Sequence, residues 1–224
     1  MATQKKFSRK DLKRPDEFIS STDQFINYCR ANKSLILFLV VGVFIVVGGA
    51  GLFLKNQKIQ SLRMESLLYE MKKMKVGEDG LEKLAGYLVE FNEGTHKNRA
   101  RMILADAYFQ KKKNGDAIKI YEKVLQKTGP KGLIRDLAQL GLAQTYEQVK
   151  NSKQAIAVYK SLIKGKNSLP LFQIYFSMVS IYEREKDYKN ALLTLREMEN
   201  QFKEHAQYDQ VSDKIHELEK LARF

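Results

Sequence analysis

The chain has 224 residues, 29% of them charged, and a formal net charge of +13. Its single cysteine, Cys29, excludes a disulfide framework within one chain. One uncharged run, Leu35–Leu54, divides the sequence into a head of 34 residues and a tail of about 170, which is long enough for one domain with a sizeable core.

The head begins with a basic cluster. Six Lys or Arg residues and one acid, Asp11, lie between Lys5 and Arg14. Beside a membrane such a cluster is attracted to anionic lipid, by about 1 kcal/mol per basic residue near the surface. An arm that binds nucleic acid would need aromatic side chains arranged for stacking, and the cluster shows no such arrangement. We therefore predict contact with anionic lipid and no nucleic-acid partner.

The second part of the head, residues 16–33, has the spacing of an amphipathic helix. One helical face and its flanks carry Phe18, Ile19, Thr22, Phe25, Ile26 and Cys29. One interpretation is an interfacial or partner-binding helix that leads into the apolar run. The other is a short helical connection with no function of its own, and the sequence leaves both open.

The run Leu35–Leu54 has twenty residues without a charge. As a helix it would be about 30 Å long, which matches the hydrocarbon core of a bilayer. A buried core helix would show a polar face or a break. A signal peptide would have a shorter apolar region close to the start of the chain, with a small-residue cleavage site. Here Leu52–Leu54 continue the run past the small residues Gly48–Gly51, which lack GxxxG spacing. We predict a retained membrane anchor, with the oligomeric state open.

The orientation of this anchor is predicted from the basic excess of the head. Short flanking segments determine orientation more than long domains, and the basic flank stays in the cytoplasm. Residues 1–34 carry eight Lys or Arg and four Asp or Glu. We therefore expect a single-pass protein with a cytoplasmic N-terminus and its tail on the other side of the membrane.

Three segments of the tail repeat one pattern: Leu104–Leu125, Leu142–Ile163 and Met178–Glu199. In each, a tyrosine follows a small or compact residue after three positions, an alanine follows after nine more, and a Tyr or Leu after another four. The period is 38 and then 36 residues, which is typical of stacked helical repeats. The residues expected to pack the repeats are Ala105, Tyr108, Ala117, Tyr121, Ala143, Tyr146, Ala155, Tyr159, Tyr182 and Ala191.

The tail is thus expected to be all-α, with two helices in each repeat. The turns between them are predicted at Asn114–Asp116, Asn151–Ser152 and Lys186–Asp187. The expected organisation is a basic head with an amphipathic helix (1–34), a transmembrane helix (35–54), a linker helix with a degenerate first repeat (55–97), three repeats (98–202) and a C-terminal capping helix (203–224).

Residues 98–201 resemble the tetratricopeptide family, in which small residues and an aromatic on the first helix precede Ala and an aromatic on the second. The resemblance implies a helical-repeat solenoid with a protein-binding groove lined mainly by first helices. The groove residues that it implies are Arg99, Met102, Asp106, Phe109, Leu137, Leu140, Gln144, Glu147, Gln173, Phe176, Ser180 and Glu183. The apolar members would suit an amphipathic helix or an extended apolar peptide. Alternatively, some of them are core residues covered by a neighbouring unit or the terminal helix.

The complete layout also resembles the YfgM-like ancillary subunit of the bacterial Sec translocon, over about residues 30–200. This resemblance implies an inner (plasma) membrane protein with its repeats in the periplasm. The implied partners are the translocon, periplasmic chaperones or client peptides.

The sequence shows no pattern of catalytic residues. His96, His205 and His216 are too scattered for a metal site, and no glycine-rich phosphate loop is present. We therefore expect no enzyme activity, no metal and no cofactor. Two hypotheses for a binding function remain open: an adaptor at the translocation or periplasmic-folding machinery, and a structural scaffold of an envelope or motility assembly.

Overall fold

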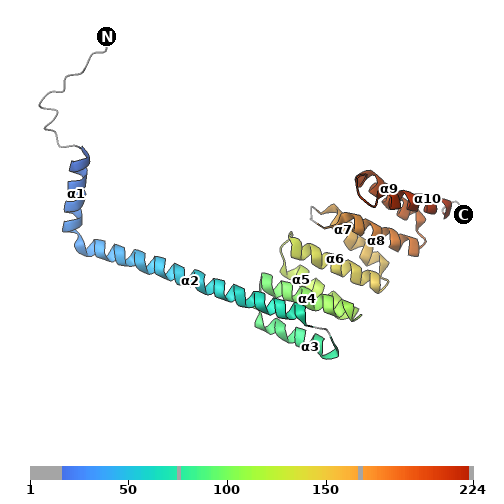
Figure 1. The fold of residues 1–224 in the computed structure, drawn as a ribbon, viewed down its shortest axis with the longest axis horizontal. Coiled ribbons are helices and arrows are strands. Elements are labelled where there is room, and N and C mark those ends of the chain that lie inside the picture. Colours follow the sequence, from blue (N-terminus) through green and yellow to red (C-terminus); the bar gives the residue numbers. More distant parts are fainter. Residues whose placement is uncertain (1–16, 75–76, 166–168, 222–224) are drawn as a thin grey trace, which may run out of the picture. The chain divides into compact units, whose positions relative to one another are not determined.

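The computed structural model describes residues 17–74, 77–165 and 169–221, and the chain forms two compact units, residues 1–61 and 62–224 (Figure 1). In the described part of the chain all regular structure is helical, as predicted. The basic cluster between Lys5 and Arg14 lies outside the described residues.

The first unit contains α1 (Glu17–Ala31) and most of α2 (Lys33–Lys73). Within α1, Phe25 is exposed, whereas Cys29 is half-buried. In the searched part of the chain, α2 is the one helix long and apolar enough to cross a membrane, judged by length and composition, and its apolar window is entirely unburied.

Helix α2 has 41 residues and does not stop at the end of the apolar run. The predicted transmembrane helix (35–54) and the start of the predicted linker helix (55–97) lie on this one continuous helix. Residues 55–73 contain neither Gly nor Pro, so no local signal ends the helix after Leu54.

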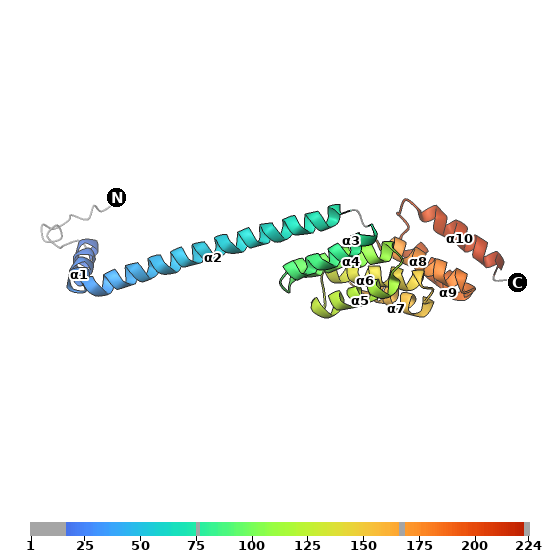
Figure 2. The same cartoon turned by 90° about the horizontal axis from the view of Figure 1, so that it is seen from below.

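The second unit is a row of stacked helices that begins with the last turns of α2 (Figures 1 and 2). A short helix α3 (Glu78–Tyr87) and the 3-10 turn η2 (Leu88–Glu90) follow. The remaining helices are α4 (Thr95–Gln110), α5 (Asn114–Lys127), α6 (Leu133–Gln148), α7 (Ser152–Lys164), α8 (Leu171–Arg184), α9 (Tyr188–Gln201) and α10 (Tyr208–Leu221). The pairs α4/α5, α6/α7 and α8/α9 are the three predicted repeats.

The turn inside each pair has the same backbone geometry. A lysine adopts a left-handed conformation, with φ of 58° at Lys112, 60° at Lys150 and 59° at Lys186. The amide that follows each lysine donates to the carbonyl of a tyrosine five residues earlier: Tyr108, Tyr146 and Tyr182. These 6→1 hydrogen bonds terminate the first helix of each repeat as in a Schellman motif.

The second helix of each pair starts immediately after this turn. Asn151 and Asp187 cap α7 and α9, and each side chain accepts a hydrogen bond from a backbone amide three residues later. One predicted turn was misplaced, because Asn114–Asp116 form the first turn of α5. Asn and Asp are favoured at helix starts as well as in turns, which explains the difference.

The entry to the first helix of each pair also follows the repeat. Gly94 and Gly132, which are 38 residues apart, precede α4 and α6 with φ of 143° and 135°. Side chains rarely tolerate this conformation, so glycine is favoured at both positions. Pro170 occupies the corresponding place before α8.

The residues expected to pack the repeats are buried or half-buried. Tyr108 and Tyr146 are half-buried, and each packs against two neighbouring clusters of the core and so joins successive repeats. The buried members are Ala105, Ala117, Tyr121, Ala143, Ala155, Tyr159, Tyr182 and Ala191. Helix α10 closes the row, with Val211, Ile215 and Leu218 buried in the core that it shares with α8 and α9.

Candidate protein-binding groove

A concave surface lies between the end of α2, α4 and α6. We call it the α4–α6 groove, and its volume is about 500 Å³. Its lining is mostly aliphatic, with charged groups from Lys72, Arg99 and Asp106. The full lining is Leu68, Lys72, Arg99, Met102, Ile103, Asp106, Leu133, Ile134, Leu137, Leu140, Gly141 and Gln144.

Six of the twelve groove residues expected from the sequence come together here. They are Arg99, Met102, Asp106, Leu137, Leu140 and Gln144. Leu137 is exposed, and Leu140 is half-buried at the edge of the core. The exposed residue Leu133 adds apolar surface that the sequence reading did not include.

The other six expected residues do not line this groove. Phe109 packs against the core between α4, α5 and α6, and Ser180 is exposed on α8. Glu147 accepts a hydrogen bond from Tyr159 at 3.0 Å. The remaining three contact other side chains of the C-terminal part: Gln173 with Gln207, Phe176 with Phe172, and Glu183 with Lys214 of α10.

The two groove residues on α2, Leu68 and Lys72, were not predicted from the sequence. A signal exists in the sequence, because the degenerate first repeat is predicted within residues 55–97. The last turns of α2 therefore occupy the position of a first helix. Extending the groove mapping to that unit would have placed its side chains beside α4.

Gly141 lines the groove and lies directly against the ring of Tyr121 on α5. A Cβ added at Gly141 would lie 2.5 Å from the Tyr121 ring, so only glycine allows this approach of α6 to α5. The Tyr121 hydroxyl donates to Asp106 Oδ1 at 2.5 Å, and burial raises the pKa of Tyr121. The residue Asp106 reaches the surface, but desolvation of its carboxyl in the groove raises its pKa against the opposing effect of the Tyr121 donor.

Ion pairs attach the end of α2 to α4. Glu65 on α2 accepts a hydrogen bond from Arg99 and also lies 3.3 Å from His96 Nε2. The Arg99 hydrogen bond is the main reason why the pKa of Glu65 lies below its usual value. Arg63 adds a longer contact to Glu90 in η2, at 3.7 Å. Arg99 is therefore both a groove residue and a link to α2.

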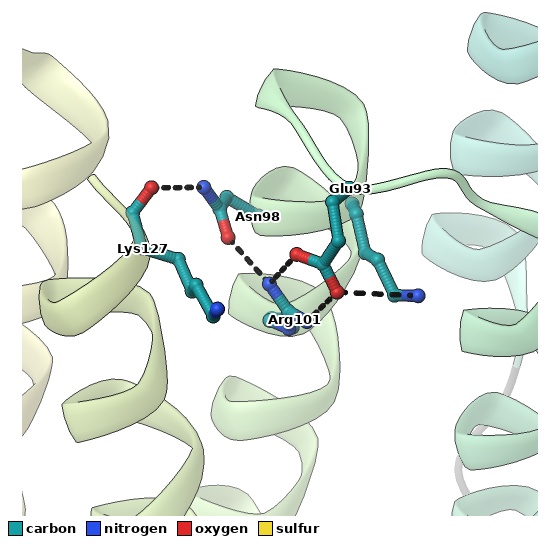
Figure 3. A network of polar contacts seen from close by, with 5 residues as sticks. Glu93, Asn98, Arg101 and Lys127 are labelled. Carbon is teal, nitrogen blue, oxygen red and sulfur yellow. Dashed lines mark hydrogen bonds and ion pairs between the residues drawn. The ribbon is translucent and has the colours of Figure 1, made fainter.

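A buried arginine on α4, Arg101, is the centre of a network of polar contacts (Figure 3). Arg101 is 2% exposed and donates to both oxygens of Glu93, at 3.0 and 2.7 Å. It also donates to Asn98 Oδ1 at 2.8 Å, and Asn98 Nδ2 donates to the carbonyl of Lys127 at the end of α5. Arg101 and Lys97 lower the pKa of Glu93 to about 2, chiefly through the Arg101 hydrogen bond. The network fixes the start of α4 relative to α5.

Two of the three histidines contact a side chain of a helix that is distant in the sequence. His96 faces Glu65, and His205 stacks on Phe172 with ring centroids 3.8 Å apart. Within the residues that the structure describes, no group of His, Cys, Asp and Glu side chains could hold a metal ion. Tetratricopeptide-like folds are typically non-catalytic, and the α4–α6 groove presents mainly aliphatic surface.

Comparison with known proteins agrees with the repeat architecture. A family model for the tetratricopeptide repeat-like domain matches residues 27–166, from the end of α1 through the first two complete helix pairs. A search of curated proteins found no match. The matched segment covers more than half of the chain and includes the long apolar helix. The chain therefore belongs to the tetratricopeptide repeat-like domain family.

Proposed function

We propose that this protein is a membrane-anchored adaptor that binds partner proteins in the α4–α6 groove. The observation that carries the proposal is an open, mainly aliphatic groove of about 500 Å³ on a tetratricopeptide-like fold. A protein-binding role is the usual one for such repeats. Exposed apolar concave surface is also typical of sites that receive another protein.

The proposed anchor is the apolar part of α2. None of its apolar window is buried in the structure, so the repeats do not use it as core. The family match begins at residue 27, before this run, which supports an apolar helix that is retained with the repeats. We propose a single-pass topology in the inner membrane, with the basic head on anionic lipid in the cytoplasm and the repeats in the periplasm.

The proposed occupant of the groove is an amphipathic helix of the partner. Leucine, isoleucine and methionine side chains line it from three helices, and they can contact an aliphatic helical face. Lys72 and Arg99 on one side favour acidic residues beside that face. A basic occupant would bring like charges together there.

The proposed partners are the Sec translocon, periplasmic chaperones or their clients. The support is the layout of one anchor followed by repeats, which resembles a translocon-associated subunit. Site-specific photocrosslinking from Leu137 in native membranes tests this assignment. Adducts with translocon or chaperone subunits are expected, whereas a single adduct with a folded envelope or motility component would replace the adaptor by the scaffold hypothesis.

The groove itself can be tested with a defined peptide. The probe is a fluorescent peptide of roughly 14 residues, about four helical turns, with leucines on one face and glutamates beside them. We expect it to bind the full chain in phosphatidylcholine nanodiscs more tightly than a lysine-flanked counterpart, measured by fluorescence anisotropy. Leu137→Glu should abolish binding, because it places a charge in the apolar surface.

The matched control is Leu193→Glu on α9. Leu193 is also an exposed leucine, but it lies outside the α4–α6 groove, so this variant should bind as the unaltered chain does. Equal loss in both variants, or no binding of either peptide, would contradict the groove as a helix-binding site.

A further inference from the structure

The end of α2 forms one wall of the α4–α6 groove. Glu65, Leu68 and Lys72 follow i, i+3 and i+7 spacing, so they share one face of the helix. Leu68 and Lys72 line the groove, and Leu68 is 3% exposed in a core cluster that includes Leu104 of α4. The apolar segment proposed to span the membrane and this wall thus belong to one continuous helix, α2.

Glu65 is placed to control how this wall meets α4. It contacts Arg99 and His96, which lie one turn apart on α4. Arg99 lines the groove, so its guanidinium is oriented by a carboxylate that is not itself a lining residue. The hydrogen bond from Arg99 is charge-assisted and holds the planar guanidinium in a defined direction.

We infer that Glu65 is a positioning residue for the α4–α6 groove: it joins the end of α2 to α4 through Arg99 and His96, so that this end of the helix closes the groove on one side. The binding role of the groove rests on the proposed function, whereas the placement of the wall does not. By linkage, an occupant that contacts Leu68 or Lys72 stabilises the attachment of α2 to α4, and loss of that attachment weakens the occupant's binding.

The placement of the wall is tested by a distance between spin labels. In a Cys29→Ser background, labels at Lys73→Cys on α2 and Gln148→Cys on α6 report the position of the wall, and neither residue lines the groove. The full chain is measured in phosphatidylcholine nanodiscs by pulsed electron paramagnetic resonance. We expect one narrow distance distribution, which broadens and shifts to longer distances in Glu65→Ala.

Two further variants separate positioning from a general loss of structure. The charge swap Glu65→Arg with Arg99→Glu retains the guanidinium–carboxylate pair and should restore the narrow distribution. Glu70 is another glutamate of α2, and it is exposed and lies outside the groove. Glu70→Ala should therefore leave the distance distribution unchanged. An unchanged distribution in Glu65→Ala, or no recovery in the charge swap, overturns the inference.

The second measurement is binding of the leucine- and glutamate-containing peptide described above. Glu65→Ala should weaken its binding roughly tenfold, equivalent to about 1.4 kcal/mol, with no effect of Glu70→Ala. An altered distance distribution with unchanged peptide affinity overturns the positioning role. If the unaltered chain does not bind the peptide, the proposed function fails. The distance distributions of the unaltered chain and of Glu65→Ala then still test whether Glu65 positions the end of α2 against α4.

Discussion

Gly141 shows how one missing side chain sets the distance between two helices. Its α-carbon faces the buried ring of Tyr121, whose hydroxyl is held by Asp106. Because both ends of Tyr121 are constrained, the ring cannot withdraw from an added methyl group. The groove lining at Gly141 and the contact between α5 and α6 therefore depend on the same glycine.

We predict that Gly141→Ala destabilises the repeat unit by up to about 2 kcal/mol, because an overpacking cost of about 1–3 kcal/mol is offset by a gain of about 1 kcal/mol in helix propensity. Urea unfolding followed by circular dichroism measures the change. Gly115→Ala on α5 is the matched control, because a Cβ there has open space, and it should stabilise the protein by up to about 1 kcal/mol. Equal stabilisation by both substitutions would show that Tyr121 adjusts freely.

Glu93 gives the buried Arg101 its counter-charge, and this has a predictable dependence on pH. The pKa of Glu93 falls from 4.5 to about 2 on folding, so its ionised form stabilises the folded chain. That contribution is fully present above about pH 4.5 and is lost as the pH falls toward about 2. Glu93→Gln should therefore be less stable than the unaltered chain near neutral pH, and the difference should shrink over that interval. A difference that stays constant from neutral pH to about pH 2 would contradict this role of Glu93.

At the scale of helices, α10 completes the row by covering α8 and α9. Leu218 is fully buried in the C-terminal core, whereas Leu221 on the same helix is 46% exposed. We predict that Leu218→Ala lowers the free energy of unfolding by about 2–5 kcal/mol, and that Leu221→Ala changes it by less than about 0.5 kcal/mol. Urea unfolding distinguishes the two. Similar small effects would mean that α10 is not part of the cooperative unit.

The helix pairs could be predicted because small and aromatic residues recur at fixed spacing. Alanine at 117, 155 and 191 allows close approach between helices, and this requirement recurs in each pair. The boundary predicted at Leu54 between the transmembrane helix and the linker helix marks a change of composition, whereas helix propensity continues across it. Hydropathy detects a change of surroundings, whereas a helix ends only at a backbone signal.

The groove could be predicted only in part, because it depends on neighbours that the repeat pattern does not specify. Three expected residues on α4 (Arg99, Met102 and Asp106) meet three on α6 (Leu137, Leu140 and Gln144). On α8, Gln173 and Glu183 instead contact the segment after α9 and α10, respectively. Arg101 was missed because a charged residue in a helix pattern is normally read as exposed. Its burial depends on Glu93 and Asn98, whose convergence follows from the turn at Gly94 rather than from spacing alone.

At the scale of the whole molecule, the function depends on which side of the membrane the repeats occupy. The head is short and basic, and short basic flanks stay in the cytoplasm. We predict that the repeats are on the other side.

In a Cys29→Ser background, Lys153→Cys on the exposed surface of α7 and Ser8→Cys in the head serve as two reporters. In cells with a permeabilised outer membrane, an impermeant maleimide should label Lys153→Cys at once, and Ser8→Cys only after the inner membrane is lysed. The head reporter controls for inner-membrane leakage, because labelling of both positions before lysis would reveal it. The reverse pattern would place the repeats in the cytoplasm. The groove would then face cytoplasmic proteins, and association with periplasmic chaperones or clients would be impossible.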